Sequence, residues 1–249
     1  LGALSLSSSS SLDEKLNALG LLANVLEAAP NRDAARKKDV RLFDVALHAA
    51  ENGETPEVKR RGWLSLVRLA AGPRVDVLQR LDESKWADLV MRAMGKGETA
   101  AICELSVRAL SELIGSLGPP TTLVLNQPGL LQQLVLAGGA ATTPNHVKWW
   151  VFRTLAEVAR SGEGARRVFR EDGSSAALLQ AVERGGPESS VGAAWRVWWR
   201  LADHEELKVR VATLPGFGDA MVRGLRSPNR MTRHRALRAL GKLTSAAEA

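Results

Sequence analysis

Four arginines recur along the chain at almost equal intervals, and their type and spacing could do binding chemistry. They are Arg108, Arg153, Arg196 and Arg238, at spacings of 45, 43 and 42 residues. The last two are followed four residues later by further cations, Arg200 and Lys242. A guanidinium presents a planar fork of N–H donors that matches carboxylate and phosphate oxygens. The pattern therefore predicts a binding surface for an anionic partner.

Acidic neighbours limit that surface to the C-terminal half of the chain. Arg108 is followed four residues later by Glu112, and Arg153 by Glu157. Residues four apart are neighbours on a helix, so these pairs are expected to neutralise each other. Beyond them the partners are basic, and the stretch "RSPNRMTRHRALR" adds further arginines.

Three interpretations of the arginine row stay open. The first is a set of solvated helix faces, because runs of charge usually face solvent. The second is a groove that docks an acidic protein segment through Arg–carboxylate pairs. The third is a phosphate-backbone site for RNA or DNA, although the row lacks the interleaved aromatic side chains typical of single-strand binders.

No arrangement of residues predicts catalysis. The sequence contains no GxxxxGK[ST], GxGxxG, GxSxG or HExxH motif, and "GKGET" has the wrong spacing for a phosphate loop. The four histidines are scattered without paired ligand spacing. Cys103, the single cysteine, is expected to be a small core residue. We therefore expect no enzyme activity, no cofactor and no metal.

Composition bounds the class of protein and its compartment. The formal net charge is +7, which favours anionic partners such as nucleic acid, acidic proteins or lipid headgroups. One cysteine allows no internal disulfide, which suits a reducing compartment. The apolar stretches are too short to span a bilayer. The chain opens without Met on "LGALSLSSSSS", a flexible Ser-rich tail that fits either a truncated start or the remainder of an organellar presequence.

One amphipathic helix recurs six times, and this repeat is the strongest signal in the sequence. Taking the central apolar residue of "AWRVWWRLA" as the anchor, the spacings between anchors are 44, 44, 45, 43 and 42 residues. Apolar residues also recur three before, three after and four after the anchor, which describes one helical stripe. The six anchors are Leu22, Leu66, Leu110, Leu155, Trp198 and Leu240.

The tryptophans are assigned to the core by this register. Trp195, Trp198 and Trp199 are expected to pack between neighbouring helices of the fifth unit, because large aromatics at core spacing usually do. Trp149 and Trp150 have the same default interpretation. One of that pair could be partly exposed and would then be a candidate interface anchor.

Each recurring helix is preceded by a second helix and by a shorter first one. The second helices are predicted from "VRLFDVALHAA", "KWADLVMRAM", "GLLQQLVLAG", "AALLQAVER" and "GFGDAMVRGL", each ending in breaker residues. The shorter segments are "VDVLQRLDES", "ARRVFREDG" and "LKVRVATLPG". Three helices at a period of 42–45 residues is the layout of an α-solenoid.

The segments "ARRVFREDGSSAALLQAVERGG" and "LPGFGDAMVRGLRSPNRMTRHRALRALGKLT" resemble armadillo repeats, with HEAT repeats as the near alternative. The resemblance implies a right-handed superhelix of about six units whose third helices line a concave groove. Armadillo proteins that bind extended peptides carry a repeated Trp and, four residues later, an Asn on these helices. Here only Asn24 matches, so importin-like recognition of basic nuclear localisation signals is disfavoured.

The sequence thus predicts a non-catalytic protein-interaction scaffold whose groove docks an acidic segment. We expect it to be a subunit of a larger assembly in an organelle, with the mitochondrion favoured. A cytosolic adaptor or Hsp70 cochaperone-like protein is the alternative, and a nucleic-acid-binding scaffold is third. The expected partner-binding residues are Arg108, Arg153, Arg196, Arg200, Arg238 and Lys242. The tail is placed at 1–12 and a single repeat domain at 13–249, with third helices near 16–27, 60–71, 103–115, 147–160, 191–202 and 231–245.

Overall fold

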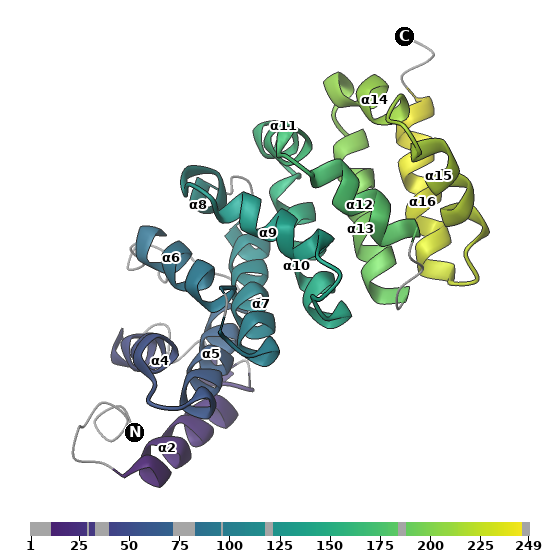
Figure 1. The fold of residues 1–249 in the computed structure, drawn as a ribbon. Helices are drawn as coiled ribbons and strands as arrows, with labels where there is room; N and C mark the ends of the chain where they lie inside the picture. Colours follow the sequence, from purple (N-terminus) through teal and green to yellow (C-terminus); the bar gives the residue numbers. More distant parts are fainter. Residues whose placement is uncertain are drawn as a thin grey trace. The chain divides into compact units, whose positions relative to one another are not determined.

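The chain is helical throughout the part that its structure describes. The computed structural model describes residues 11–28, 30–32, 40–71, 83–95, 97–117, 122–183 and 188–245. Within these ranges every regular element is a helix and no strand occurs (Figure 1). The all-α prediction is therefore confirmed for the described residues.

The chain divides into two compact units, Leu1–Leu117 and Gly118–Ala249. In the first unit α2 packs on α5 and α5 packs on α7, while α4 and α6 pack against α5 and α7. The bounds are α2 Leu12–Val25, α4 Val40–Asn52, α5 Pro56–Ala70, α6 Glu83–Ala93 and α7 Ala100–Leu117.

The second unit repeats the same arrangement, and its described residues also include short first helices. The helix α10 packs on α13 and α13 packs on α16. The second helices form a neighbouring row, in which α9 packs on α12 and α12 on α15, and each contacts the third helix of its own layer. The bounds are α8 Thr122–Asn126, α9 Leu130–Gly139, α10 Asn145–Val158, α11 Gly162–Arg170, α12 Ser174–Glu183, α13 Glu188–Ala202, α14 Glu205–Ala212, α15 Phe217–Arg226 and α16 Arg230–Thr244.

Each segment that carries an anchor residue is a helix of this set, namely α2, α5, α7, α10, α13 and α16. We call the helices of one repeat a layer and its last helix the third helix. Two predicted segments lie largely outside the described residues. The Ser-rich tail lies outside the described residues up to residue 10, and Ser11 caps α2. The short helix expected from "VDVLQRLDES" lies almost wholly outside them.

The apolar stripe of the third helices forms the core of both units. The anchors Leu66, Leu110, Leu155 and Trp198 are at most 1% exposed. The residues three positions earlier, Trp63, Val107, Phe152 and Trp195, are fully buried. The repeat register predicted from apolar spacing is therefore the register in which the helices pack.

Left-handed glycines place the second helices of the second unit. Gly129, Gly173 and Gly216 precede α9, α12 and α15 with φ of 82°, 78° and 81°. An L-residue with a side chain rarely adopts this conformation, so a glycine is needed where the first helix turns into the second.

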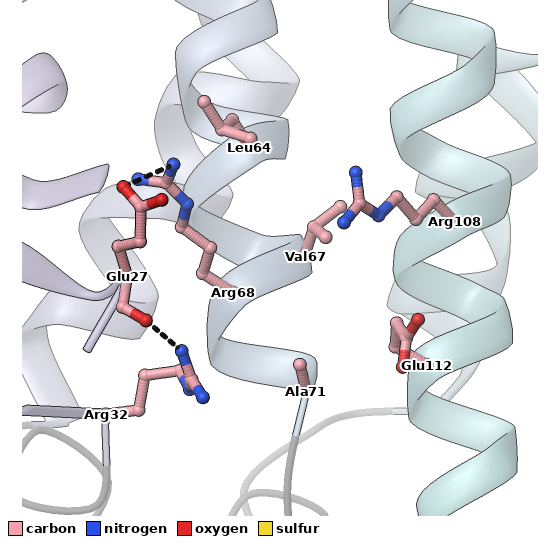
Figure 2. A pocket seen from close by; sticks show the side chains of 8 residues that line it. All are labelled: Glu27, Arg32, Leu64, Val67, Arg68, Ala71, Arg108 and Glu112. Carbon is pink, nitrogen blue, oxygen red and sulfur yellow. Dashed lines mark hydrogen bonds and ion pairs between the residues drawn. The ribbon is translucent and has the colours of Figure 1, made fainter. Parts of the chain in front are cut away.

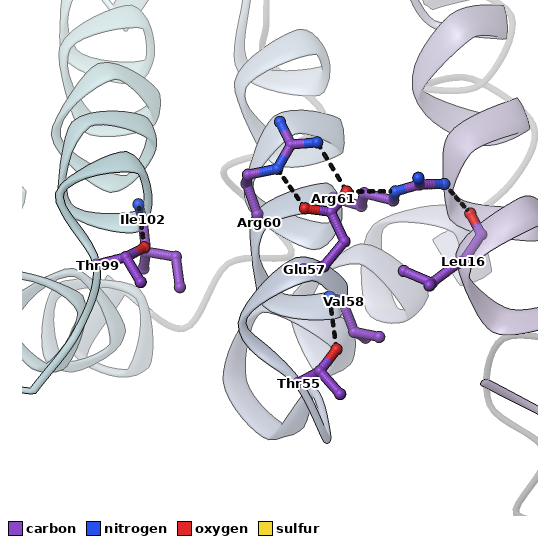
Figure 3. Close-up of polar contacts among 8 residues, drawn as sticks. All are labelled: Leu16, Thr55, Glu57, Val58, Arg60, Arg61, Thr99 and Ile102. Carbon is purple, nitrogen blue, oxygen red and sulfur yellow. Dashed lines mark hydrogen bonds and ion pairs between the residues drawn. The ribbon is translucent and has the colours of Figure 1, made fainter. Parts of the chain in front are cut away.

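Side-chain hydrogen bonds fix the start of α5 (Figure 3). The Thr55 hydroxyl caps the helix by accepting from the backbone N–H three residues later, at 3.3 Å. The Glu57 carboxylate accepts hydrogen bonds from Arg60 at 2.7 Å and from Arg61 at 2.8 Å. These bonds, with Arg60 contributing most, lower the pKa of Glu57 to about 2. Arg61 also donates to the Leu16 carbonyl and so joins α5 to α2.

An ion pair repeats between successive layers of the first unit. Lys15 on α2 contacts Glu54 in the turn before α5, and Lys59 on α5 lies 2.6 Å from Glu98 before α7. The two lysines are 44 residues apart, and so are the two glutamates. The repeat therefore extends from the apolar stripe to the polar contacts between layers.

Candidate protein-interaction face

Three stacked third helices of the second unit carry most of the expected partner-binding residues. Two positions before the anchor stand Arg153, Arg196 and Arg238, on α10, α13 and α16. Two positions after the anchor α13 and α16 add Arg200 and Lys242. We call these five residues the basic face. The helix α10 packs on α13 and α13 packs on α16 (Figure 1). Because residues four apart share one side of a helix, the five residues lie on the same side of this stack.

Two carboxylates partly neutralise the basic face across the contacts between layers. Glu157 on α10 lies 2.5 Å from Arg196 on α13 and 3.2 Å from Arg160. Asp203, just after α13, lies 2.6 Å from Lys242 on α16. Arg196 is therefore an anchored cation held by a carboxylate that is only 7% exposed. The sequence expectation that the Arg196 region lacks acidic partners is corrected by these contacts between helices.

Tryptophan side chains lie among the cations of the basic face. The Arg200 guanidinium carbon lies 4.4 Å from the centre of the Trp199 ring, and that of Arg238 lies 4.8 Å from it. On α10 the Arg153 guanidinium lies 5.5 Å from the Trp149 ring and 4.9 Å from Trp150. Stacking uses the flat face of a guanidinium and leaves its N–H edge available to a second partner.

The expectation that Trp195, Trp198 and Trp199 are all core is wrong for one of the three. Trp195 and Trp198 are fully buried, and their rings meet Phe217 at 6.2 Å and 5.1 Å. Trp199 is half-buried, because its position on the helix turns it toward the cations of α16. The pair on α10 divides as expected, since Trp150 is 8% exposed and Trp149 is half-buried.

Positive charge accumulates where the basic face is partly desolvated. Burial lowers the pKa of Arg200, and the neighbouring Arg196 and Arg160 guanidiniums lower it further. Burial also lowers the pKa of Arg235, with a second contribution from Arg196. Both residues stay cationic at neutral pH. An anion bound here would offset the repulsion among these guanidinium groups.

Arg108 belongs to the first unit, where it lines a separate pocket. The pocket has a volume of about 290 Å³. Arg68 contacts Glu27 at 3.4 Å (Figure 2). Arg68 also donates to the Ala23 carbonyl, and Arg32 donates to the Leu26 carbonyl at 3.1 Å. Arg68 and Arg32 thus satisfy backbone carbonyls at the C-terminal end of α2. The lining residues are Glu27, Arg32, Leu64, Val67, Arg68, Ala71, Arg108 and Glu112.

No family model and no curated protein sequence matches the chain. Among solved structures, the designed armadillo repeat protein YIII(Dq)4CqI superposes with a TM-score of 0.78 at 15% identity, over 97% of this chain and 98% of that one. The chain has the armadillo-repeat fold.

Two further armadillo structures agree with this assignment. The designed armadillo repeat protein YIII(Dq.V1)4CPAF, in complex with the peptide (KR)4, gives a TM-score of 0.81 at 13% identity over 97% of this chain and 98% of that one. Armadillo repeat proteins computationally designed for modular peptide recognition give 0.79 at 15% identity over the same shares. The predicted resemblance to armadillo repeats is thereby confirmed at the level of the fold.

Among the described residues no group of His, Cys, Asp and Glu side chains could hold a metal ion. Burial raises the pKa of the half-buried Cys103 thiol, and Glu104 raises it further, so the reactive thiolate is scarce at neutral pH. No helix of the described residues is long and apolar enough to cross a membrane.

Sequence reasoning missed two contributors to the basic face. Asp203 reaches Lys242 although 39 residues separate them in the chain. Trp199 supports Arg200 and Arg238, yet it was assigned to the core with its neighbours. A signal for Trp199 existed, because it stands one position after the anchor and outside the buried columns at three before, three after and four after.

Proposed function

We propose that the chain is a protein-binding scaffold whose basic face docks an acidic segment of a partner protein. The observation that carries the proposal is the Trp199 ring with two guanidiniums, Arg200 and Arg238, stacked on it at 4.4 Å and 4.8 Å. Arg238 is exposed and forms no ion pair with any residue that the structure describes. Its N–H donors are therefore available to a carboxylate.

The arrangement of the basic face also sets the size of the docked segment. Helices stacked roughly 8–10 Å apart place three third helices over about 20 Å. An extended chain covers this length with about six residues. An acidic peptide of that length could place a carboxylate against each layer.

The comparisons support protein binding in a general way. One armadillo relative was solved with the basic peptide (KR)4, and others were designed for modular peptide recognition. The basic face of the present chain would repel a basic peptide and attract an acidic one. The proposal therefore differs from recognition of a basic segment.

The experiment measures binding of a fluorescein-labelled Asp/Glu-rich peptide by fluorescence anisotropy. Reversing Arg238→Glu and Lys242→Glu together should weaken binding by about tenfold or more, because two attractive charges become repulsive. The matched control is Arg170→Glu with Arg92→Glu, which reverses two exposed arginines on α11 and α6, outside the basic face, and should leave affinity within about twofold. Equal losses in both variants would show general charge attraction and contradict the proposal.

A nucleic-acid-binding scaffold is the second candidate, and the half-buried Trp149 and Trp199 favour it. Aromatic side chains among cations are the stacking platforms expected of single-strand binders. A single-stranded oligonucleotide is therefore added as competitor at the same ionic strength. If it displaces the acidic peptide and binds at least tenfold more tightly, nucleic acid replaces protein as the partner class.

The narrower form of the proposal makes the chain a subunit of a larger assembly in an organelle. Its support is the formal net charge of +7, which suits acidic partners in general. Purification of the tagged chain from fractionated cells tests both parts. Recovery in the cytosolic fraction with a chaperone would favour the adaptor or cochaperone alternative instead.

A further inference from the structure

The last layer of the second unit exposes an apolar side chain from each of its three helices. Val209 on α14 is 69% exposed, Val222 on α15 is 46% exposed and Leu237 on α16 is 59% exposed. Side chains of this size normally enter the core of a solenoid layer. The exposed set therefore needs an explanation from the repeat register.

The register shows that these positions are the ones that contact a following layer. The counterparts of Leu237 are Phe152 and Trp195, which are fully buried, and the Trp195 ring meets Phe217 of the next layer. A Cβ on Gly224 of that layer would lie 2.6 Å from the Trp195 ring, so the two layers are in close contact. Leu237 thus holds an interlayer position that no layer among the described residues covers.

The other two helices give the same result. The counterparts of Val222 are Val135 on α9, which is 2% exposed, and Leu179 on α12, which is half-buried. The counterpart of Val209 is Arg166, whose guanidinium lies 2.7 Å from Glu206 of the next layer. We call Val209, Val222 and Leu237 the donor face, because their positions in earlier layers contact the layer that follows.

The first unit carries the complementary half of such a contact on α2. Leu21 is 55% exposed and Val25 is 47% exposed. In the following helices the same positions are buried: Ser65 and Ala109 are fully buried, and Leu69 and Leu113 are at most 3% exposed. We call Leu21 and Val25 the acceptor face, because they stand where later helices receive the preceding layer.

Charge at the two faces is also complementary. The start of α16 carries exposed Arg230 and Arg233, and α15 ends on exposed Arg226. The start of α2 carries exposed Asp13 and Glu14. When third helices stack in the register of the repeat, these basic and acidic starts come to the same end of the contact.

We propose that a second copy of this chain occupies the donor face with its acceptor face. The contact continues the interlayer packing already present in the fold, with Leu237 against the Leu21 and Val25 side of α2. It joins two different surfaces, so it is heterologous and builds open chains of copies or a closed ring.

The test is sedimentation velocity of the full chain over a wide range of concentrations. The weight-average mass should rise with concentration, and Leu237→Asp or Leu21→Asp should each raise the dissociation constant by about tenfold or more. Leu136→Asp is the matched control, since Leu136 is 61% exposed on α9 and belongs to neither face. Circular dichroism checks that each variant keeps its helices.

Mixing the two variants makes the prediction sharper. Leu21→Asp keeps an intact donor face, and Leu237→Asp keeps an intact acceptor face. At a concentration where the wild type associates, each variant alone should be largely monomeric, while the equimolar mixture should form a dimer and stop there. A chain that stays monomeric at every concentration overturns the proposal, and so does a mixture that forms no dimer.

Discussion

The carboxylate of Glu157 lies 2.5 Å from the guanidinium of Arg196, across the contact between α10 and α13. The same carboxylate lies 3.2 Å from Arg160 and is 7% exposed. One buried acid thus holds two cations at the edge of the basic face. The contact links the stability of the stack to the charge that a partner would meet.

Replacing Glu157 by Gln should lower stability and raise affinity for anions. The amide cannot neutralise Arg196 and Arg160, which would then repel each other and Arg200, at a cost of about 2 kcal/mol. The urea midpoint measures the first effect, and anisotropy with the acidic peptide measures the second. Glu183→Gln, which removes a long and exposed contact with Arg223 at 4.0 Å, should change stability by less than about 0.5 kcal/mol. Equal midpoints for both variants would contradict the assigned role.

Adjacent tryptophans should affect different properties when truncated to Ala. Trp198→Ala removes a fully buried ring from the core and should cost roughly 3–5 kcal/mol of unfolding free energy. Trp199→Ala removes a half-buried ring and should cost much less, but it frees Arg200 and Arg238 from their stacked positions. We expect acidic-peptide affinity to fall for Trp199→Ala, as measured by anisotropy. A similar loss of stability in both variants would place Trp199 in the core after all.

The sequence predicted the fold well because the repeat leaves a periodic trace. Burial of the anchor and of the residue three positions earlier follows from helical geometry alone, as Leu110 and Val107 show. Polar contacts between layers are less predictable, because they depend on how far one helix is shifted along the next. The sequence predicts a pair between Glu157 and Arg153 on the same helix, but it does not predict that the Glu157 carboxylate also reaches Arg196 on α13.

The ends of the stack were predictable in part. The last helix was known from its sequence to keep an apolar stripe, and the structure shows Leu237 of that stripe to be 59% exposed. The exposure of Val209 could not be predicted, since its counterpart Arg166 is polar and meets Glu206 through an ion pair. Only the packed register shows that Val209 takes the place at which Arg166 contacts the next layer.

Acid should remove the contribution of Glu57 to the stability of α5. Its pKa is lowered from 4.5 to about 2, so the contribution is complete above pH 4.5 and is lost as the pH falls toward 2. Because the carboxylate is 39% exposed, solvent screening limits it to about 1 kcal/mol or less. The difference in melting temperature between the wild type and Glu57→Gln should therefore shrink below pH 4.5.

The control for that titration is Thr55→Ala at the same helix start. The hydroxyl caps the helix at 3.3 Å, and its loss should cost about 1 kcal/mol. Since a hydroxyl does not titrate in this range, the deficit of Thr55→Ala should be the same at pH 7 and pH 3. If both variants lose their difference from the wild type in acid, a general effect of pH is responsible rather than Glu57.

Two glycines should respond in opposite directions to an added methyl group. A Cβ on Gly62 of α5 would lie 2.5 Å from the backbone nitrogen of Ala50 and 2.8 Å from the carbonyl carbon of Ala49, so α4 would have to move away. Gly62→Ala should therefore destabilise by about 1–3 kcal/mol, even though Ala favours helix. A Cβ on Gly115 of α7 meets nothing within 4 Å, and Gly115→Ala should stabilise by about 0.5–1 kcal/mol. Urea midpoints measure both; a rise for Gly62→Ala would mean that α4 and α5 are not in close backbone contact.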